Sequence, residues 1–359
     1  MAFYALIMAG GVGTRLWPLS RRDRPKQALK LVGDRTMFEH AIDRIAPIFQ
    51  PEEIFVVTGA EHVASLAAQA PELPLENYIV EPEGRGTAPA IGLGAIHLLR
   101  SDPDAVMAVL TADHFITDVP QFRQVLAAAA EVAEDGHLVT LGIKPSSPST
   151  GYGYIKQGES LAKVDGFTAF RAERFTEKPS AETAVHMVES GEYSWNSGMF
   201  IWRVDRIVEE FESQMDEFYA QLAEVQATLG TPGYKPTLGR VWPQVTKQTI
   251  DYGVMEGAKD VAVIPVDIGW SDVGSWASLL ELLPADADGN TVVGPHVGID
   301  TRDTLVFNRD GKRLVATIGV QDLIIVDTED ALLVCPKERE QEVREMVQLL
   351  RSEERNGYL

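Results

Sequence analysis

The stretch Ala5-Leu6-Ile7-Met8-Ala9-Gly10-Gly11-Val12-Gly13-Thr14-Arg15-Leu16 decides the fold, because a short apolar run ends in closely spaced glycines. The run at residues 5–8 predicts a buried strand. The glycines behind it would let backbone N–H groups approach an anion, since no Cβ stands in the way. The stretch therefore predicts a strand whose carboxyl end leads into an anion-binding turn. A tight turn that binds nothing is the alternative.

The spacing of these glycines disfavours two common nucleotide sites. Leu16 stands where G-x-G-x-x-G needs its third glycine, and no Gly-Lys-Ser/Thr follows as a P-loop would require. A dinucleotide dehydrogenase and a P-loop ATPase are both disfavoured for that reason. Arg15 and the following Pro25-Lys26-Gln27 add two cations to the same loop region. A simple turn does not require them, so they favour the anion-binding interpretation.

Beyond this stretch, apolar β-branched runs alternate with helical patterns. We expect further strands at 54–58, 106–110 and 138–143. Thr36-Met37-Phe38-Glu39 has the form of a capping box, which predicts a helix that ends before Pro47. A second helix is predicted by apolar residues at helical spacing, Phe122, Val125, Leu126, Ala129, Val132 and Ala133. The alternation predicts an α/β fold with a doubly wound, mostly parallel, Rossmann-like sheet, whose ligands bind beyond the carboxyl ends of the strands.

The pattern changes from about Asp286 onward. Gly294-Pro295-His296-Val297-Gly298 and the short β-rich stretches after it resemble the coils of a small β-helix. A final helix is predicted by apolar residues at spacings of three and four, Val343, Met346, Val347 and Leu350. We expect that face to pack against the rest of the protein or a second subunit, which leaves a homodimer open. The predicted domains are 1–285 and a β-helix-like C-terminal domain with a terminal helix at 286–359.

Composition limits the class of protein. The 359 residues allow two domains, and 45% hydrophobic with 24% charged residues is ordinary for a globular chain. The net charge of −21 argues against a nucleic-acid surface, although a phosphorylated small substrate needs only a few local cations. The N-terminus lacks a basic leader, and no apolar run approaches the roughly 18 residues of a membrane helix. The single cysteine, Cys335, fits a reducing compartment, so we expect a cytoplasmic protein that does not engage a membrane.

Several motifs in a fixed order give the chain its resemblance to a known family. Residues 10–20 and 25–27 resemble the nucleotide-binding loop of sugar nucleotidyltransferases, and Trp17-Pro18-Leu19-Ser20 is similar to the mannose-1-phosphate guanylyltransferase branch. Further matches follow in order: Gly84-Arg85-Gly86-Thr87-Ala88-Pro89-Ala90, Ala112-Asp113-His114, Thr150-Gly151-Tyr152-Gly153-Tyr154-Ile155, Glu177-Lys178-Pro179, Trp195-Asn196-Ser197-Gly198-Met199-Phe200, Ile250-Asp251-Tyr252-Gly253-Val254-Met255-Glu256 and Gly269-Trp270-Ser271-Asp272-Val273-Gly274-Ser275-Trp276. The resemblance spans residues 3 to about 350. One departure is Gly86, where the branch usually carries asparagine.

The resemblance implies an enzyme that transfers GMP from GTP to mannose 1-phosphate, with residues 1–285 as the catalytic domain. The phosphate oxygen of the sugar phosphate would attack the α-phosphorus in line, and pyrophosphate would leave. One alternative is another hexose 1-phosphate or base. Another is a non-catalytic regulatory subunit that binds nucleotide sugars, which would be expected to lose part of the charged set. A fused isomerase would need more residues than remain after the nucleotidyltransferase region.

Two aspartates are candidate metal ligands. Asp113 follows the strand at 106–110, and Asp272 lies in a loop rich in glycine and tryptophan. An isolated aspartate at a strand end is more often a cap or turn residue. The resemblance implies instead that this pair holds the catalytic Mg²⁺, which needs only one or two protein carboxylates besides substrate phosphates. We interpret His114 as a loop residue beside the site, since imidazole is a poor Mg²⁺ ligand.

The resemblance assigns further residues to the two substrates. Arg15 and Lys26 would stabilise the charge on the α-phosphate and pyrophosphate. The nucleotide-binding residues would be Gly10, Gly11, Gly13, Thr14, Gln27, Glu81, Gly84 and Thr87. The sugar-phosphate-binding residues would be Gly153, Glu177, Lys178, Asn196 and Asp251, with Lys178 on the phosphate. Glu81 and Gln27 would read guanine, because a carboxylate can accept from its N1–H and N2–H₂ groups. A solvated residue before Pro82 is the alternative for Glu81, as a loop entry is for Lys178.

Overall fold

The computed structural model describes residues 1–11, 13–309 and 311–359. Its contacts divide the chain into two compact units. The first unit comprises 1–10, 41–112 and 116–270, and the second comprises 11–40, 113–115 and 271–359. These units are interleaved in sequence, so they do not correspond to two consecutive domains. The division into domains at 1–285 and 286–359 stays a prediction. Within the described residues, no helix has both the length and the apolar character needed to cross a membrane.

The first unit is built on a large sheet. The strands are β1 (Phe3–Met8), β2 (Ile54–Gly59), β3 (Tyr78–Glu81), β4 (Val106–Thr111), β6 (Leu138–Ile143), β7 (Gly153–Val164), β8 (Phe167–Glu177), β9 (Tyr193–Arg203) and β10 (Val261–Val266). Across the sheet they follow the order β3-β2-β1-β4-β9-β6-β10-β8-β7. Strands β3, β2, β1 and β4 are parallel, as are β6 and β10. Strand β9 lies antiparallel between β4 and β6. The predicted mostly parallel α/β fold is confirmed.

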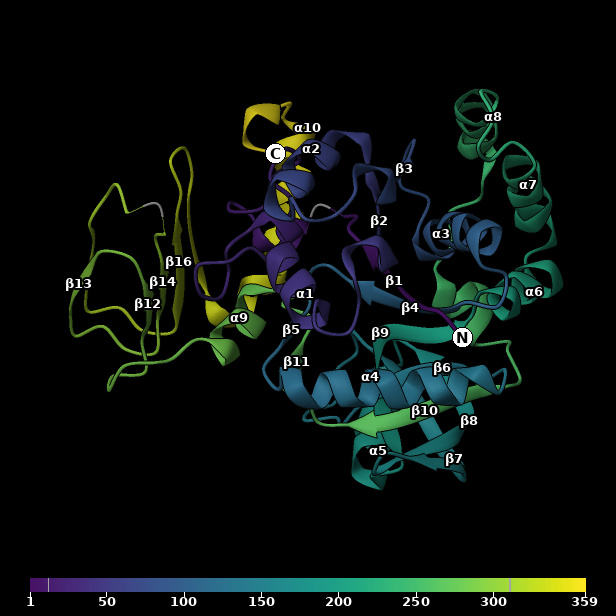
Figure 1. Ribbon diagram of the computed structural model, residues 1–359. Coiled ribbons are helices and arrows are strands. Elements are labelled where there is room, and N and C mark those ends of the chain that lie inside the picture. The colour runs from purple at the N-terminus through teal and green to yellow at the C-terminus, as the bar shows by residue number, and fades with distance from the viewer. Residues whose placement is uncertain (12, 310) are drawn as a thin grey trace. The chain divides into compact units, whose positions relative to one another are not determined.

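Helices pack on both faces of this sheet. The helices in this part of the chain are α1 (Met37–Ile45), which is divided between the two units, α2 (Ala60–Gln69), α3 (Thr87–Ser101), α4 (Val119–Glu134), α5 (Ala181–Ser190), α6 (Val204–Gln214), α7 (Asp216–Gln226) and α8 (Tyr234–Val241). Helix α3 packs on β1 and β2, whereas α4 packs on β4, β6 and β9, and Figure 1 shows them on opposite sides of the strands. The capping box forms, because Glu39 accepts from the Thr36 N–H and Thr36 Oγ accepts from the Glu39 N–H. All six residues predicted for the apolar face of α4 are buried.

The second unit contains the β-helix-like coils. Its elements are β12 (Thr291–Val293), β13 (His296–Ile299), β14 (Leu305–Phe307), β15 (Val315–Ile318), β16 (Leu323–Asp327), β17 (Leu332–Pro336), α9 (Trp276–Leu282) and α10 (Val343–Ser352), with 3-10 turns η1 (Thr14–Leu16) and η2 (Lys26–Ala28). Strands β12, β14 and β16 stack in parallel register, and β13 pairs in parallel with β15. This stacking is what the predicted coils require. A core that includes Trp17, Trp276 and Phe307 holds the unit together.

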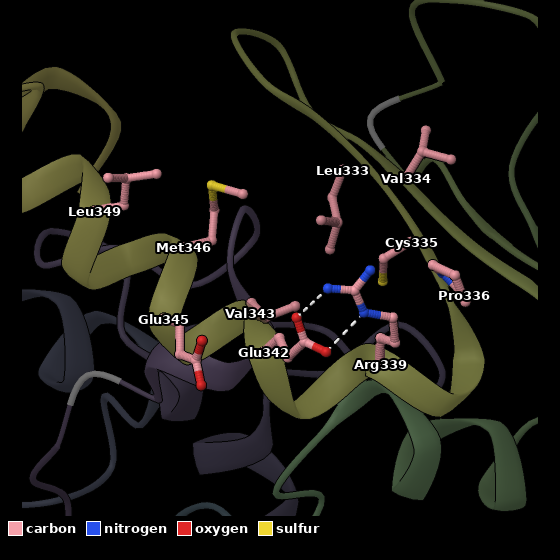
Figure 2. A pocket seen from close by; sticks show the side chains of 10 residues that line it. All are labelled: Leu333, Val334, Cys335, Pro336, Arg339, Glu342, Val343, Glu345, Met346 and Leu349. Carbon is pink, nitrogen blue, oxygen red and sulfur yellow. Dashed lines mark hydrogen bonds and ion pairs between the residues drawn. The ribbon is translucent and has the colours of Figure 1, made fainter.

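Only part of the predicted apolar helix face packs within the chain, and packing against a second subunit stays a prediction. Val343 and Val347 on α10 are buried in the core of the second unit, and Leu350 packs partly against it. Met346 does not pack there, because it is 43% exposed and lines a groove beside β17. Figure 2 shows Met346 and Leu349 on the side of the helix that faces this groove. The spacing of the apolar residues is right, but the stripe they form is wider than the buried surface.

Candidate active site

The strand order places a switch point between β1 and β4. The chain runs from β1 to β2 and β3 on one side and then returns to β4 on the other side of β1. Met8 pairs with Thr111, so the two strands end at the same edge of the sheet. The glycine stretch leaves β1 there, and Ala112-Asp113-His114 leaves β4. Ligands of open α/β sheets bind beyond strand ends at such a point.

A cavity of about 400 Å³ in the second unit collects the charged residues of these segments. We call it the cationic cavity; its lining residues are Gly13, Thr14, Arg15, Lys26, Asp113, His114, Asp272, Gly274 and Arg344. Gly13 has a φ of +70°, and a Cβ there would lie 2.6 Å from the Cβ of Lys26. Only glycine therefore allows the turn and the lysine to approach this closely. The structure thus brings together Arg15, Lys26, Asp113 and Asp272, which the sequence predicts as catalytic residues.

Lys26 connects the two aspartates. Its side chain is nearly buried, and its Nζ lies 2.8 Å from Asp113 Oδ2 and donates to the main-chain oxygen of Asp272 at 2.5 Å. Burial works to raise the pKa of Asp113, but the charges of Lys26 and His114, together with the hydrogen bonds to the carboxylate, outweigh it and lower that pKa. Asp113 is therefore a carboxylate at neutral pH. His114 Nε2 lies 4.0 Å from Asp113 Oδ1, beside the carboxylates as expected.

The donors of this cavity fit a hard divalent cation. Both carboxylates line it, and Asp272 Oδ1 also accepts from the Gly274 N–H at 3.2 Å. Among the described residues, no group of three or more His, Cys, Asp or Glu side chains is arranged to hold a metal. Two carboxylates without a further protein ligand suit Mg²⁺, which usually keeps waters and binds substrate phosphates as well. They do not suit a metal that needs a complete protein cage.

The predicted sugar-phosphate residues gather in the first unit. We call Gly153, Glu177, Lys178, Asn196 and Asp251 the Glu177 cluster. Gly153 pairs with Glu177 across β7 and β8, and Lys178 Nζ lies 2.6 Å from Glu177 Oε1. Burial works to lower the pKa of Lys178, but the bond to Glu177 and its charge prevail and raise it. Lys178 is half exposed and has a φ of +47°, an uncommon conformation for a non-glycine residue.

A β-bulge aims Asn196 into this cluster. Thr140 pairs with Phe200 and Gly142 with Asn196, so β9 has more residues than β6 over the same length. Asn196 Oδ1 accepts from the Gly198 N–H at 3.1 Å and from Thr140 Oγ at 3.2 Å. Its Nδ2 then donates to Asp251 Oδ1 at 2.8 Å. Thr140 is a contributor that the sequence did not indicate, because it is one polar residue in an otherwise apolar strand.

Asp251 and Glu81 are predicted site residues of the first unit in which burial raises the pKa of the carboxyl group. Burial, with the charge of Glu177, raises the pKa of Asp251 to about 6. Glu81 ends β3, is 8% exposed, and its Oε2 has no hydrogen-bond partner within the described part of the chain. Burial raises the pKa of Glu81 to about 7 against the opposing bond from the Arg85 N–H. The alternative of a solvated Glu81 before Pro82 is therefore wrong.

The remaining nucleotide-binding candidates lie in several places. Thr87 Oγ accepts from the Ile250 N–H at 2.8 Å at the start of α3, and Gly84 lies in the preceding loop. Gly86 has a φ of +94°, and a Cβ there would clash with the main-chain oxygen of Gln248, so this backbone favours glycine at the position where the branch usually carries asparagine. Gln27 is buried in η2. Gly10 and Gly11 are exposed in the turn and do not line the cationic cavity.

Comparison with known proteins places the chain in a family. A model of the nucleotidyl transferase family matches residues 4–289, and one of the MannoseP isomerase/GMP-like beta-helix domain matches residues 294–350. A mannose-1-phosphate guanylyltransferase of Klebsiella pneumoniae is 40% identical over 98% of this chain and 75% of its own length. This chain belongs to the mannose-1-phosphate guanylyltransferase family.

Other members agree with this placement. A mannose-1-phosphate guanylyltransferase of Escherichia coli (strain K12) is 41% identical over 99% of this chain and 75% of its own length. A crystal structure described as mannose-1-phosphate geranyltransferase from Thermus thermophilus has a TM-score of 0.88 at 36% identity, and covers 98% of this chain and 100% of that one. The chain thus spans about three quarters of these curated relatives and the whole of that structure. Nucleotidyltransferases generally use a divalent metal ion.

A further cavity of about 470 Å³ is the groove beside α10 (Figure 2). Its walls are mainly apolar, with Leu333 and Val334 from β17 facing Met346 and Leu349. Arg339 and Glu342 line it as an ion pair. None of the predicted site residues lies there, so the groove is separate from the proposed chemistry.

Proposed function

We propose that the protein transfers GMP from GTP to mannose 1-phosphate, giving GDP-mannose and pyrophosphate. The observation that carries the proposal is the cationic cavity, where the glycine turn, two cations and two carboxylates meet in a member of this family. A non-catalytic subunit would be expected to lack part of this set, but the chain retains Arg15, Lys26, Asp113 and Asp272 there. Lys178 is also present in the Glu177 cluster.

The reaction joins two anions, so the residues have to neutralise repulsion and align the reacting groups. Arg15 and Lys26 would bind the phosphates of GTP and stabilise the charge that moves to pyrophosphate. Asp113 and Asp272 would hold Mg²⁺, which supplies positive charge to phosphate oxygens when bound. Gly10, Gly11, Gly13 and Thr14 would offer backbone N–H groups to the same phosphates.

The Glu177 cluster would bind mannose 1-phosphate. The half-exposed ammonium of Lys178 is available to the phosphate, and its raised pKa keeps it charged. Glu177, Asn196 and Asp251 would bind sugar hydroxyls, and Gly153 would contact the sugar ring. The attacking phosphate is already ionised near neutral pH, so no residue has to act as a general base.

Selection of guanine would depend on Glu81, with Gln27, Gly84 and Thr87 beside the nucleotide. The unpartnered Oε2 of Glu81 is a buried acceptor, and such an atom is costly unless a ligand satisfies it. Guanine offers N1–H and N2–H₂ as a donor pair, which adenine lacks on the corresponding edge. This match supports GTP as the nucleotide.

The wider setting is also part of the proposal. Residues 1–285 would form the catalytic domain and 286–359 the C-terminal domain. The net charge of −21 supports a protein that does not bind nucleic acid, and the single cysteine supports a cytoplasmic location.

A product assay tests the function directly. The protein would be incubated with Mg²⁺ and each of GTP, ATP, UTP and dTTP, paired with mannose 1-phosphate or glucose 1-phosphate, and the nucleotide sugar identified. We expect GTP with mannose 1-phosphate to give the highest kcat/KM. A preference for UTP or dTTP with glucose 1-phosphate would overturn the assignment, and GTP binding without turnover would favour the regulatory subunit.

A further inference from the structure

The C-terminal helix brings a third cation to the cationic cavity. Arg344 is the second residue of α10, and it lines this cavity with Arg15 and Lys26. Helix α10 packs against η1, the turn that carries Arg15. No motif in the sequence marks Arg344, because it lies in a segment whose only pattern is the apolar spacing of a helix.

The position of Arg344 is fixed by its neighbours in the helix. Val343 and Val347 are 3% and 4% exposed and belong to the same apolar core as Leu16 and Trp17. Figure 2 shows that the groove beside β17 is lined by other residues of α10, among them Met346 and Leu349. The helix is therefore anchored by its valines and presents Arg344 to the cavity from a packed element. The packed helix fixes the backbone of Arg344, so only its side chain has to be ordered when a ligand binds.

The positive charge of Arg344 is not paired with another described side chain. Among the described residues, its guanidinium has no hydrogen-bond or ion-pair partner, although the chain has 53 acidic and 32 basic residues. Lys26, in contrast, is paired with Asp113. A guanidinium presents a planar fork of donors that matches two oxygens of a phosphate. A triphosphate carries more negative charge than Lys26 and Arg15 can balance, so the cavity has a use for a further arginine.

We propose that Arg344 binds the phosphate chain of GTP, so that the C-terminal helix completes the nucleotide site. This inference rests on the proposed function. The charge of the triphosphate is present before the reaction, and removal of such a ground-state contact chiefly raises KM. We expect loss of this charge-assisted contact to weaken GTP binding about tenfold.

The test compares Arg344→Gln with Arg351→Gln. Arg351 is an exposed arginine on the same helix, about two turns or roughly 10 Å further along, and it does not line the cavity. For each variant, KM for GTP and for mannose 1-phosphate would be measured, together with GTP affinity by calorimetry without the sugar phosphate. We expect Arg344→Gln to raise KM and Kd for GTP about tenfold and to leave KM for mannose 1-phosphate unchanged. Arg351→Gln should match the wild type.

Arg344→Lys separates charge from geometry and should restore part of the GTP affinity, because an ammonium keeps the charge without the planar fork. Unchanged GTP affinity in Arg344→Gln would overturn the inference, as would an equal weakening in Arg351→Gln. Thermal unfolding of each variant shows whether it folds, and an exposed, unpartnered side chain should be neutral there. A wild-type protein that makes no GDP-mannose contradicts the proposed function, whereas an active wild type with an unaffected Arg344→Gln contradicts this inference alone.

Discussion

The protonation state of the Glu81 carboxyl group should change near neutral pH. Its pKa is raised to about 7 by burial, so it is largely neutral below that pH. Only the carboxylate form can accept both N–H donors of guanine. We therefore predict that kcat/KM for GTP increases with pH and levels off above about 7. A pH profile of kcat/KM, which reports groups of the free enzyme, checks this.

The control is Glu81→Gln, which keeps the shape and removes the titration. Titration of the substrate phosphates, and of Asp251 with its pKa of about 6, persists in this variant, so the difference between the two profiles isolates Glu81. The variant should also discriminate less between GTP and ITP, because ITP lacks the exocyclic amino group. Identical pH profiles for variant and wild type would show that Glu81 does not read the base.

At the scale of single residues, the sequence predicted the site residues that lie in a local motif. Lys26 and Asp113 were found because each lies in a short recognisable pattern, and the structure adds their ion pair. Thr140 and Arg344 were missed, because the reason for each is a partner or cavity formed by distant parts of the chain. A hydroxyl in a buried strand and an arginine on an exposed helix surface give no signal until the chain is folded.

At the scale of elements, the bulge in β9 allows a prediction about Thr140. Thr140→Val keeps the shape but removes the hydroxyl that donates toward Asn196 Oδ1 and the main-chain oxygen of Met199. The amide of Asn196 would then be less firmly oriented toward Asp251. We expect KM for mannose 1-phosphate to increase several-fold with KM for GTP unchanged, and the free energy of unfolding to fall by about 1–2 kcal/mol. Steady-state kinetics and denaturant unfolding measure the two effects.

A matched control separates positioning from stability. Thr304 is another fully buried threonine, and its hydroxyl donates to the main-chain oxygen of Arg302 at 2.8 Å. Thr304→Val should lower stability by a similar amount without changing KM for mannose 1-phosphate. Thr140→Ser keeps the donor and should retain the wild-type KM. If both valine variants changed KM alike, Thr140 would have only a structural role.

The elements themselves were largely predictable, but their order in the sheet was not. The capping box at Thr36 and the apolar face of α4 are local patterns, and both formed as expected. The predicted strands near the N-terminus were one or two residues short of β1, β2 and β4. The insertion of β9 between β4 and β6 could not be deduced, because periodicity does not specify which strands become neighbours. The two interleaved units could not be deduced for the same reason, because they are defined by contacts between distant segments and not by chain order.

At the scale of the whole molecule, each compact unit holds a different set of proposed contacts. The cationic cavity lies within the second unit, and the Glu177 cluster lies within the first. The excess of acidic over basic residues does not argue against anionic substrates, because the cations proposed to bind them are held at these two places. The composition was therefore a poor guide to the site, whereas the motifs located both groups of residues.

This separation predicts different kinetic effects for two lysines. Lys26 is buried against Asp113 and would stabilise charge that shifts as the bond to pyrophosphate breaks. Lys26→Ala should therefore mainly lower kcat, on the order of 10²-fold, as for other losses of preorganised charge stabilisation. Lys178 is half exposed and would hold a phosphate that is charged in the ground state. Lys178→Ala should mainly raise KM for mannose 1-phosphate, by about tenfold.

The decisive measurement is the KM of each variant for both substrates. Lys178 also has to orient the attacking oxygen, so some loss of kcat in Lys178→Ala is compatible with its role. Lys178→Arg keeps the charge and should recover part of the affinity for mannose 1-phosphate. Lys26→Ala also leaves Asp113 without its cation, so unfolding must be followed to show that the loss of kcat is not a loss of fold. If Lys178→Ala weakened GTP binding alone and left mannose 1-phosphate unaffected, the assignment of the two lysines to different substrates would be wrong.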